Sequence, residues 1–367
     1  MTIHAFPAPS IKLIFKTFFT KNNVGLFNSE KAHEYFFSRG TCALAAAIEY
    51  VMVKRRIETI KVWLPGYFCA EALVAFEGKN VRCYFYPINK NLEPDWFVIE
   101  HKAKSESPDI FILVHYFGFI NSIVRAHQFS KRNNCELIED ACHVVKLEQH
   151  PHLTIYSPRK IYSIPEGGIL ISKETIASSI TTSGEPTSSR AVWSWLIKRL
   201  IQKLLVNLRT DWHSLAGFAV HWRAEQPITD LSCNRLANNY TKKIVTEQVN
   251  ETERIIDQRR KNYASLAQVV EGKESVKPFF SHLPDNVCPY VFPLLVHSNK
   301  SVLERKLHLL GIPASSWPAL PLAVNVNQIE HSNAIWLKQH ILLLPLHQDL
   351  KSHQIEYMSK CIEKYVL

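Results

Sequence analysis

Glycine is scarce in this sequence, with 11 among 367 residues, about 3% where about 7% is usual. None of these glycines forms the G-x-G-x-x-G fingerprint of dinucleotide-binding proteins or the G-x-x-x-x-G-K-[ST] loop of P-loop proteins. Dehydrogenase, kinase and P-loop nucleotidase functions therefore lose their main sequence support.

Long apolar runs and paired cysteines are also missing. Nowhere do about 18 apolar residues follow one another, and Lys12 and Lys16 interrupt the early apolar segment, so we expect neither a spanning helix nor a signal peptide. The eight cysteines contain no C-x-x-C pair, which argues against a metal centre and a disulfide framework. We expect reduced thiols in a cytoplasmic protein.

The composition is that of a folded protein, with 46% apolar and 21% charged residues. The length allows two or three domains. The 43 basic and 33 acidic residues give a net charge of +10, which suits an anionic ligand, a membrane surface or a nucleic acid. Charge alone does not choose among these partners.

Strand-like and helical patterns alternate between residues 40 and 172. We expect strands at 60–64, 81–85, 110–115, 135–140 and 168–172, and helices at 41–54, 68–76, 96–104 and 123–133. This alternation predicts an α/β fold with a mostly parallel sheet, whose ligands bind beyond the carboxyl ends of the strands. The predicted large domain covers 1–245, with a helical excursion at about 178–230, and a small α+β domain covers 246–367.

An acid and a lysine, twenty residues apart, carry the most specific chemistry. A predicted strand ends at Asp140 in Leu137-Ile138-Glu139-Asp140-Ala141-Cys142-His143, and Lys160 follows in Ser157-Pro158-Arg159-Lys160. Pyridoxal phosphate needs a lysine that holds its aldehyde as a Schiff base and a carboxylate that keeps its ring nitrogen protonated. Asp140 and Lys160 are therefore candidate catalytic residues.

Two further segments fit the same cofactor. Gly40-Thr41 opens a predicted helix, whose first amides and Thr41 hydroxyl can receive a phosphate. Tyr67 and Phe68 follow a predicted strand and offer an aromatic face for a pyridine ring.

These motifs, in this order, resemble the DegT/DnrJ/EryC1/StrS family of pyridoxal-phosphate aminotransferases, which have the aspartate aminotransferase fold, or fold type I. The matching segments are Arg39-Gly40-Thr41-Cys42-Ala43-Leu44, Val114-His115-Tyr116-Phe117-Gly118, Ile138-Glu139-Asp140-Ala141-Cys142-His143, Glu166-Gly167-Gly168 and Leu342-Leu343-Leu344-Pro345-Leu346-His347-Gln348. The resemblance runs through most of the chain.

The resemblance also implies roles for individual residues. Lys160 would be the Schiff-base lysine and proton carrier, Asp140 the partner of the ring nitrogen, and His143 a neighbour of the phenolic oxygen. The implied phosphate ligands are Gly40, Thr41, Cys42 and Ser157. Family members also take an Asn and an Arg from the partner subunit, which implies a homodimer; the candidates here are 233–235 or 239–240.

A lysine at position 160 favours transamination over hydroxyl removal. The resemblance implies transfer of an amino group from an amino acid, with glutamate expected, to a nucleotide-linked keto sugar for a polysaccharide or another glycoconjugate. Alternatives are the same reaction on another ketone, such as a cyclitol or keto acid, and a non-catalytic regulator or scaffold. We expect no nucleic-acid partner, because no basic-aromatic cluster accompanies the charge.

One basic amphipathic segment, residues 192–209, has no role in the cofactor site that the resemblance implies. Trp193, Ile197, Leu200, Leu204 and Leu208 share one predicted helical face, and Lys198, Arg199, Lys203 and Arg209 are among the polar positions. Packing against the core or a partner subunit is favoured for this helix, and peripheral contact with an anionic membrane is the alternative.

Overall fold

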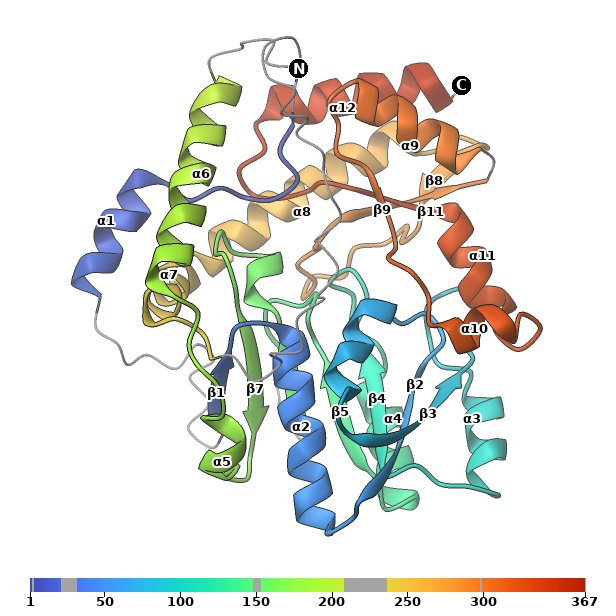
Figure 1. Ribbon diagram of the computed structural model, residues 1–367. Coiled ribbons are helices and arrows are strands. Elements are labelled where there is room, and N and C mark those ends of the chain that lie inside the picture. The colour runs from blue at the N-terminus through green and yellow to red at the C-terminus, as the bar shows by residue number, and fades with distance from the viewer. Residues whose placement is uncertain (2, 21–31, 148–152, 208–235, 298, 367) are drawn as a thin grey trace.

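A computed structural model of the chain describes residues 1, 3–20, 32–147, 153–207, 236–297 and 299–366. Its larger sheet has seven strands, and a smaller sheet of four strands lies above it in the view of Figure 1. In spatial order the large sheet consists of β1 (His33–Phe37), β7 (Gly168–Ser172), β6 (Leu153–Tyr156), β5 (Glu136–Asp140), β4 (Ile110–Val114), β2 (Thr59–Pro65) and β3 (Asn80–Tyr86).

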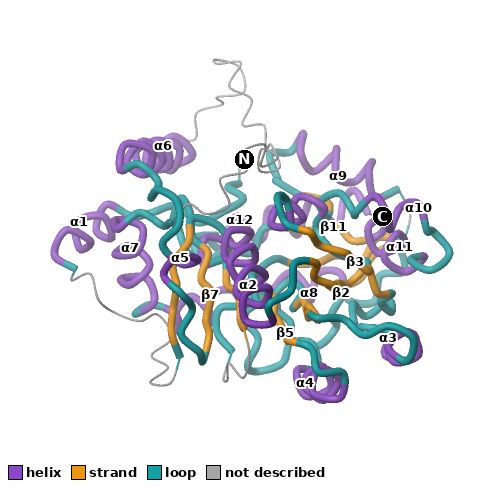
Figure 2. The backbone as a smooth tube through the Cα atoms, turned by 60° about the horizontal axis from the view of Figure 1, so that its bottom comes forward, coloured by secondary structure: helices purple, strands orange, loops and turns teal. Residues whose placement is uncertain are grey.

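The large sheet is parallel from β6 to β3, and β7 and β1 extend it with antiparallel pairs. Strand β4, with the sequence Ile-Phe-Ile-Leu-Val, is buried along its whole length, as expected for a parallel strand covered on both faces. Helices provide that cover: α2 (Gly40–Arg55) packs on β1, β6 and β7, and α4 (Ile123–Arg132) packs on β4 and β5. The arrangement is visible from below in Figure 2.

The small sheet has the order β10 (Ser315–Ser316), β11 (Ile341–Leu344), β9 (Phe292–Val296) and β8 (Val276–Pro278), and all its pairs are antiparallel. Helices α8 (Thr252–Val270), α9 (Lys300–Leu309) and α12 (Ser352–Val366) enclose an apolar cluster with it. Ile3, from the start of the chain, is buried in the same cluster, and its backbone N–H donates to the Gly311 carbonyl.

The remaining described helices are α1 (Ile11–Phe19), α3 (Trp96–Ala103), α5 (Ser178–Thr181), α6 (Ser189–Asn207), α7 (Asn239–Val249), α10 (Leu322–Val326) and α11 (Ser332–His340), with 3₁₀ segments η1 (Ala70–Phe76) and η2 (Pro158–Lys160). Among these described residues, no helix has the length and apolarity needed to cross a membrane. The cysteines in this part of the chain are all free.

The expected fold class is confirmed, with differences in detail. The expected helix at 68–76 is the 3₁₀ segment η1, and the polar stretch expected to form a long helix is divided between α7 and α8 at Asn250–Glu251. Strands β1 and β6 were not expected, because their sequences are short and their neighbours polar. The boundary near residue 245 stays a prediction, and 208–230 of the expected helical excursion lies outside the described residues.

Candidate active site

Asp140 lies at the carboxyl end of β5, in the middle of the parallel part of the sheet. It pairs in register with Val114 on β4 and Ile155 on β6, so three strand ends meet beside it. The carboxylate also ends the strand locally, because its Oδ1 accepts the backbone N–H of Cys142 at 3.1 Å. The motif thus turns the chain at the sheet edge where ligands bind in such folds.

Lys160 reaches the same edge from the segment that follows β6. Pro158 begins the 3₁₀ turn η2. Proline is favoured there because its fixed φ suits the first position of a helix. The turn brings Lys160 Nζ to 2.9 Å from Nε2 of His143, three residues after Asp140. The three predicted catalytic residues therefore lie together, although their roles stay predictions.

The backbone of Phe117 determines the tautomer of His143. Its N–H donates to His143 Nδ1 at 3.2 Å, so the proton of the neutral ring lies on Nε2. Phe117 has φ 58°, an uncommon conformation for a bulky residue, and it presents its N–H to the buried ring. Tyr290 stacks on the ring, with centroids 4.8 Å apart. His143 is thus held as a donor whose Nε2–H faces Lys160.

Two opposing effects act on the pKa of Lys160. Burial lowers the pKa of Lys160, but the facing Cys142, Tyr290 and Asp140 side chains outweigh burial and raise the pKa above its ordinary value. Burial and the nearby Lys160 hold the pKa of His143 well below its usual range. The ammonium form of Lys160 cannot accept the Nε2–H of His143, whereas the amine can. The geometry at Nζ therefore suits the nucleophilic form, and reaching that form requires loss of a proton.

The N-terminus of α2 approaches this edge closely. A Cβ at Gly40 would lie 3.0 Å from Cys142 Sγ and 3.5 Å from Ser157 Cβ, so the helix end, the acid segment and the lysine segment are neighbours. The Thr41 hydroxyl is buried and has no hydrogen-bond partner among the described residues. An unsatisfied hydroxyl at a helix N-terminus fits a phosphate group. Ser157 is also buried, and its hydroxyl donates to the Gly167 carbonyl at 3.3 Å.

The other predicted cofactor residues differ in their surroundings. The ring of Tyr67 stacks on Trp317, with centroids 4.7 Å apart, and its hydroxyl is buried without a described partner. Burial raises the pKa of Tyr67 well above its ordinary value, so the phenol stays neutral. Phe68 and Cys42 are both buried in the main apolar cluster. Their roles at a cofactor stay predictions.

One buried group at the site was not expected from the sequence. Arg259, which the sequence suggested was an exposed helix charge, is 1% exposed. Its guanidinium donates to Gln348 Oε1, to the carbonyls of Pro289 and Tyr290, and to the Ile161 carbonyl at 3.2 Å. Gln348 Nε2 donates to the same Ile161 carbonyl at 3.0 Å.

Arg259 and Gln348 therefore hold the residue next to Lys160. Among the described residues, no carboxylate lies within ion-pair distance of Arg259, and burial lowers the pKa of its guanidinium. Arg259 and Lys160 also line a common cavity of about 50 Å³, together with Tyr290 and His347. The signal in the sequence was the spacing Ile255, Arg259, Asn262, Leu266, which marks one buried face of α8.

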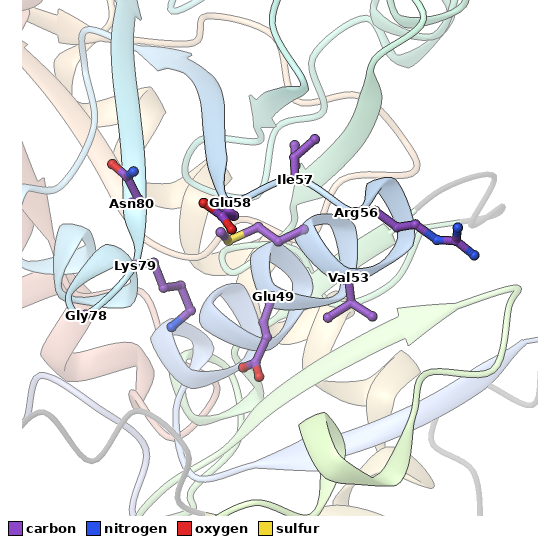
Figure 3. Close-up of a pocket in the computed structure, with 9 residues that line it drawn as sticks. Glu49, Val53, Arg56, Ile57, Glu58, Gly78, Lys79 and Asn80 are labelled. Carbon is purple, nitrogen blue, oxygen red and sulfur yellow. The ribbon is translucent and has the colours of Figure 1, made fainter.

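A larger groove of about 590 Å³ lies elsewhere (Figure 3). Its lining includes Glu49, Val53 and Arg56 from the C-terminal half of α2 and its end, with Lys79 and Asn80 opposite. At 1.5 Å per residue, the C-terminal end of α2 is about 20 Å from Thr41. None of the predicted site residues lines this groove, so it is separate from the candidate active site.

Comparison with known proteins identifies the fold. No protein-family model matches the chain, and no curated protein matches it. Among solved structures, the chain is similar to PseC of Helicobacter pylori, an aminotransferase involved in the biosynthesis of pseudoaminic acid, with 14% identity, coverage of 99% of this chain and 98% of that chain, and a TM-score of 0.70.

Two other structures extend the similarity. The PLP form of Spr1654 from Streptococcus pneumoniae, a putative sugar aminotransferase, is 12% identical over 100% of both chains, with a TM-score of 0.70. A DegT DnrJ EryC1 StrS aminotransferase from Brucella abortus is 16% identical over 91% of this chain and 86% of that chain, with a TM-score of 0.64. The chain thus has the fold of these aminotransferases, as the motifs predicted.

Proposed function

We propose that this chain is a pyridoxal-phosphate-dependent aminotransferase of the DegT/DnrJ/EryC1/StrS family. The observation that carries the proposal is the convergence of Asp140, His143 and Lys160 at one sheet edge, beside the unsatisfied Thr41 hydroxyl. Each part fits a different portion of the cofactor: an acid for the ring nitrogen, a donor for the phenolic oxygen, an amine for the aldehyde and a helix end for the phosphate.

When bound, pyridoxal phosphate supplies an aldehyde that binds amines covalently and a ring that withdraws electrons from the attached carbon. The Asp140 carboxylate would pair with the ring nitrogen and favour its protonated form. His143 donates from Nε2, because the Phe117 N–H occupies its other nitrogen. Lys160 would hold the aldehyde, and its Nζ, next to His143 Nε2, would move a proton to and from a substrate carbon held beside it.

For the substrate, we propose that glutamate donates the amino group and that a nucleotide-linked keto sugar receives it. The support comes from the sugar aminotransferases that share the fold, one of which serves the biosynthesis of pseudoaminic acid. The product would enter the assembly of a polysaccharide or another glycoconjugate. We also propose that the enzyme is a cytoplasmic homodimer, as in the family that its motifs resemble.

The test is an absorption spectrum of the purified chain with pyridoxal phosphate, before and after addition of L-glutamate. We expect a visible band that glutamate converts to a near-ultraviolet band. Lys160→Ala should lose the visible band, and borohydride should then fail to fix the cofactor to the chain. Lys173→Ala, a change at an exposed lysine of the same domain, should behave as the wild type.

The outcomes separate the parts of the proposal. A wild type without a visible band would overturn the cofactor assignment and favour a regulator or scaffold. A visible band that glutamate leaves unchanged would retain the cofactor but exclude glutamate as donor. After a positive result, keto-sugar nucleotides and simple keto acids can be compared as acceptors, and preference for a keto acid would exclude the sugar assignment.

A further inference from the structure

Helix α1 exposes most of its apolar side chains to solvent. Phe15 and Phe19 are 63% and 86% exposed, and Ile11 and Phe18 are each at least half exposed. Ile11, Phe15 and Phe19 follow one another at intervals of four residues, so they form one stripe along the helix. The opposite side of α1 packs on α7. A stripe of this kind on the surface indicates a contact with another apolar phase.

Helix α6 extends the exposed apolar surface. The buried side of α6 is formed by Val192 and Leu196, which are not on the predicted apolar face. Ile197 of the predicted face and the neighbouring Ile201 are about half exposed. Trp193 of α6 stacks on Phe18 of α1, with ring centroids 5.6 Å apart. Figures 1 and 2 both place α1 and α6 together at one side of the molecule. We call this surface the α1/α6 face.

The α1/α6 face is mainly cationic, and the acids described next to it are Asp349 beside Lys203 and Glu247, which accepts from the Thr20 hydroxyl at the end of α1. Helices α1 and α6 contain no Asp or Glu, and their cations are Lys12, Lys16, Arg190, Lys198, Arg199 and Lys203. Asp349 lies 3.7 Å from Lys203 and compensates that lysine. Lys12, Lys16, Arg190 and Lys198 are exposed beside the apolar side chains. The combination of exposed phenylalanine and exposed lysine is typical of a helix that lies in a membrane interface.

We propose that the α1/α6 face binds the surface of a membrane that contains anionic lipids. The phenylalanine and isoleucine side chains would enter the boundary between headgroups and acyl chains, and the lysines would contact lipid phosphates. A second copy is the less suitable occupant, because a symmetric dimer contact would place these cations against the same cations of the other copy. Nucleic acid would match the charge but would leave the apolar stripe exposed.

Sedimentation with vesicles tests this binding. The full chain should sediment with vesicles of phosphatidylcholine mixed with phosphatidylglycerol, should bind pure phosphatidylcholine weakly, and should dissociate as salt is raised. The double variant Phe15→Glu, Phe19→Glu should bind at least about tenfold more weakly, because it loses apolar insertion and gains repulsion. Replacing Lys12 and Lys16 by glutamine should weaken vesicle binding by about fivefold per lysine.

A matched control is available on the other side of the molecule. Phe97 of α3 is 82% exposed and lies outside the α1/α6 face, so Phe97→Glu should bind vesicles as the wild type does. Equal loss from Phe97→Glu would show that binding is nonspecific and would overturn the proposal. Absence of vesicle binding by the wild type would also overturn it.

Size-exclusion chromatography with light scattering tests the alternative that a second copy of the chain covers the α1/α6 face. If Phe15→Glu, Phe19→Glu changes the oligomeric state, the α1/α6 face is a contact between copies, and the membrane proposal is wrong. The inference does not rest on the proposed enzymatic function. An unchanged cofactor absorption band in the variant would show that the site is intact while vesicle binding is lost.

Discussion

The large sheet contributes Asp140, His143 and Lys160 to the candidate site from segments that are close together in the sequence. The small sheet and α8 contribute Arg259 and Gln348, whose shared partner, Ile161, lies 98 and 187 residues away along the chain. The polar atoms of the first group meet at one sheet edge, where Lys160 Nζ lies 2.9 Å from His143 Nε2. In the second group, Arg259 donates to Gln348, and both side chains donate to backbone carbonyls.

From this difference we predict that the first group takes part in the reaction and that the second group holds the first in place. Asp140 and His143 have functional atoms near Lys160, so changing them should alter the reaction itself. We predict that Arg259 is a positioning residue, because its described hydrogen bonds reach Lys160 through the backbones of Ile161 and Tyr290. Substitutions in the two groups should therefore have different effects on the kinetics.

The largest effect is expected at Asp140. Asp140→Asn removes the negative charge at the ring nitrogen, and we expect the transamination rate to fall by about a thousandfold or more, as for the loss of a preorganised electrostatic contact. Single-turnover kinetics with glutamate, followed by absorption, measure the rate. Asp285→Asn, at a fully exposed carboxylate, is the control. A rate within tenfold of the wild type would remove Asp140 from the mechanism.

Arg259 should show a smaller and different defect. Arg259→Lys keeps the charge but not the planar fork, so the carbonyls of Ile161, Pro289 and Tyr290 lose donors. We expect kcat to fall by about ten- to a hundredfold with little change in KM, because a small displacement of a catalytic group has this cost. The pH at which the bound cofactor's visible band changes should also move.

The control for Arg259 is Arg254→Lys, at an exposed position of the same helix where arginine pairs with Glu251. Arg259→Met tests the structural part of the role. It removes the Arg259 donors from the carbonyls of Pro289 and Tyr290 and should lower the free energy of unfolding by about 1–3 kcal/mol, the cost of leaving a buried group unsatisfied. If Arg259→Lys lowered stability while kcat and the pH dependence of the band stayed the same, the residue would be structural only.

Burial at His347 predicts how stability changes with pH. Burial lowers the pKa of His347 to about 4, and its Nε2 donates to the His4 carbonyl at 2.9 Å. The unfolded chain takes up a proton below about pH 6.5, whereas the folded chain does so only near pH 4. Stability should therefore fall as the pH falls through this window, by about 3 kcal/mol in total.

Denaturant unfolding at a series of pH values measures this dependence. His347→Gln retains a donor for the His4 carbonyl but does not titrate, so its stability should be flatter between pH 7 and pH 4 than that of the wild type. His353→Gln, at an exposed histidine of α12, is the control. Identical pH profiles for His347→Gln and the wild type would show that His347 is not the titrating group.

The sequence predicted the large-sheet side of the site because its signals are local. The strand that ends at Asp140, the turn at Pro158 and the helix that begins at Gly40 each follow from a few adjacent residues. For Arg259 the sequence held only the helical spacing of one buried face, and for Trp317 it held no signal, because the environment of both residues depends on contacts with distant segments. An arginine in a polar helix is usually exposed, and tertiary packing overrides that expectation here.

The smallest effect on the reaction is expected at Thr41, because its hydroxyl would contribute to the affinity for the cofactor and not to the rate at saturation. Thr41→Val keeps the side-chain shape but removes the buried, unsatisfied hydroxyl. A hydrogen bond to a charged group contributes about 1.5–3 kcal/mol, so we expect the affinity for pyridoxal phosphate to fall by about ten- to a hundredfold. The helix amides would remain, so the cofactor should still bind and turn over at saturation. Thr182→Val, where the hydroxyl bonds only within α5 and its end, should leave the affinity unchanged. Equal affinity in Thr41→Val would show that the Thr41 hydroxyl does not bind the phosphate.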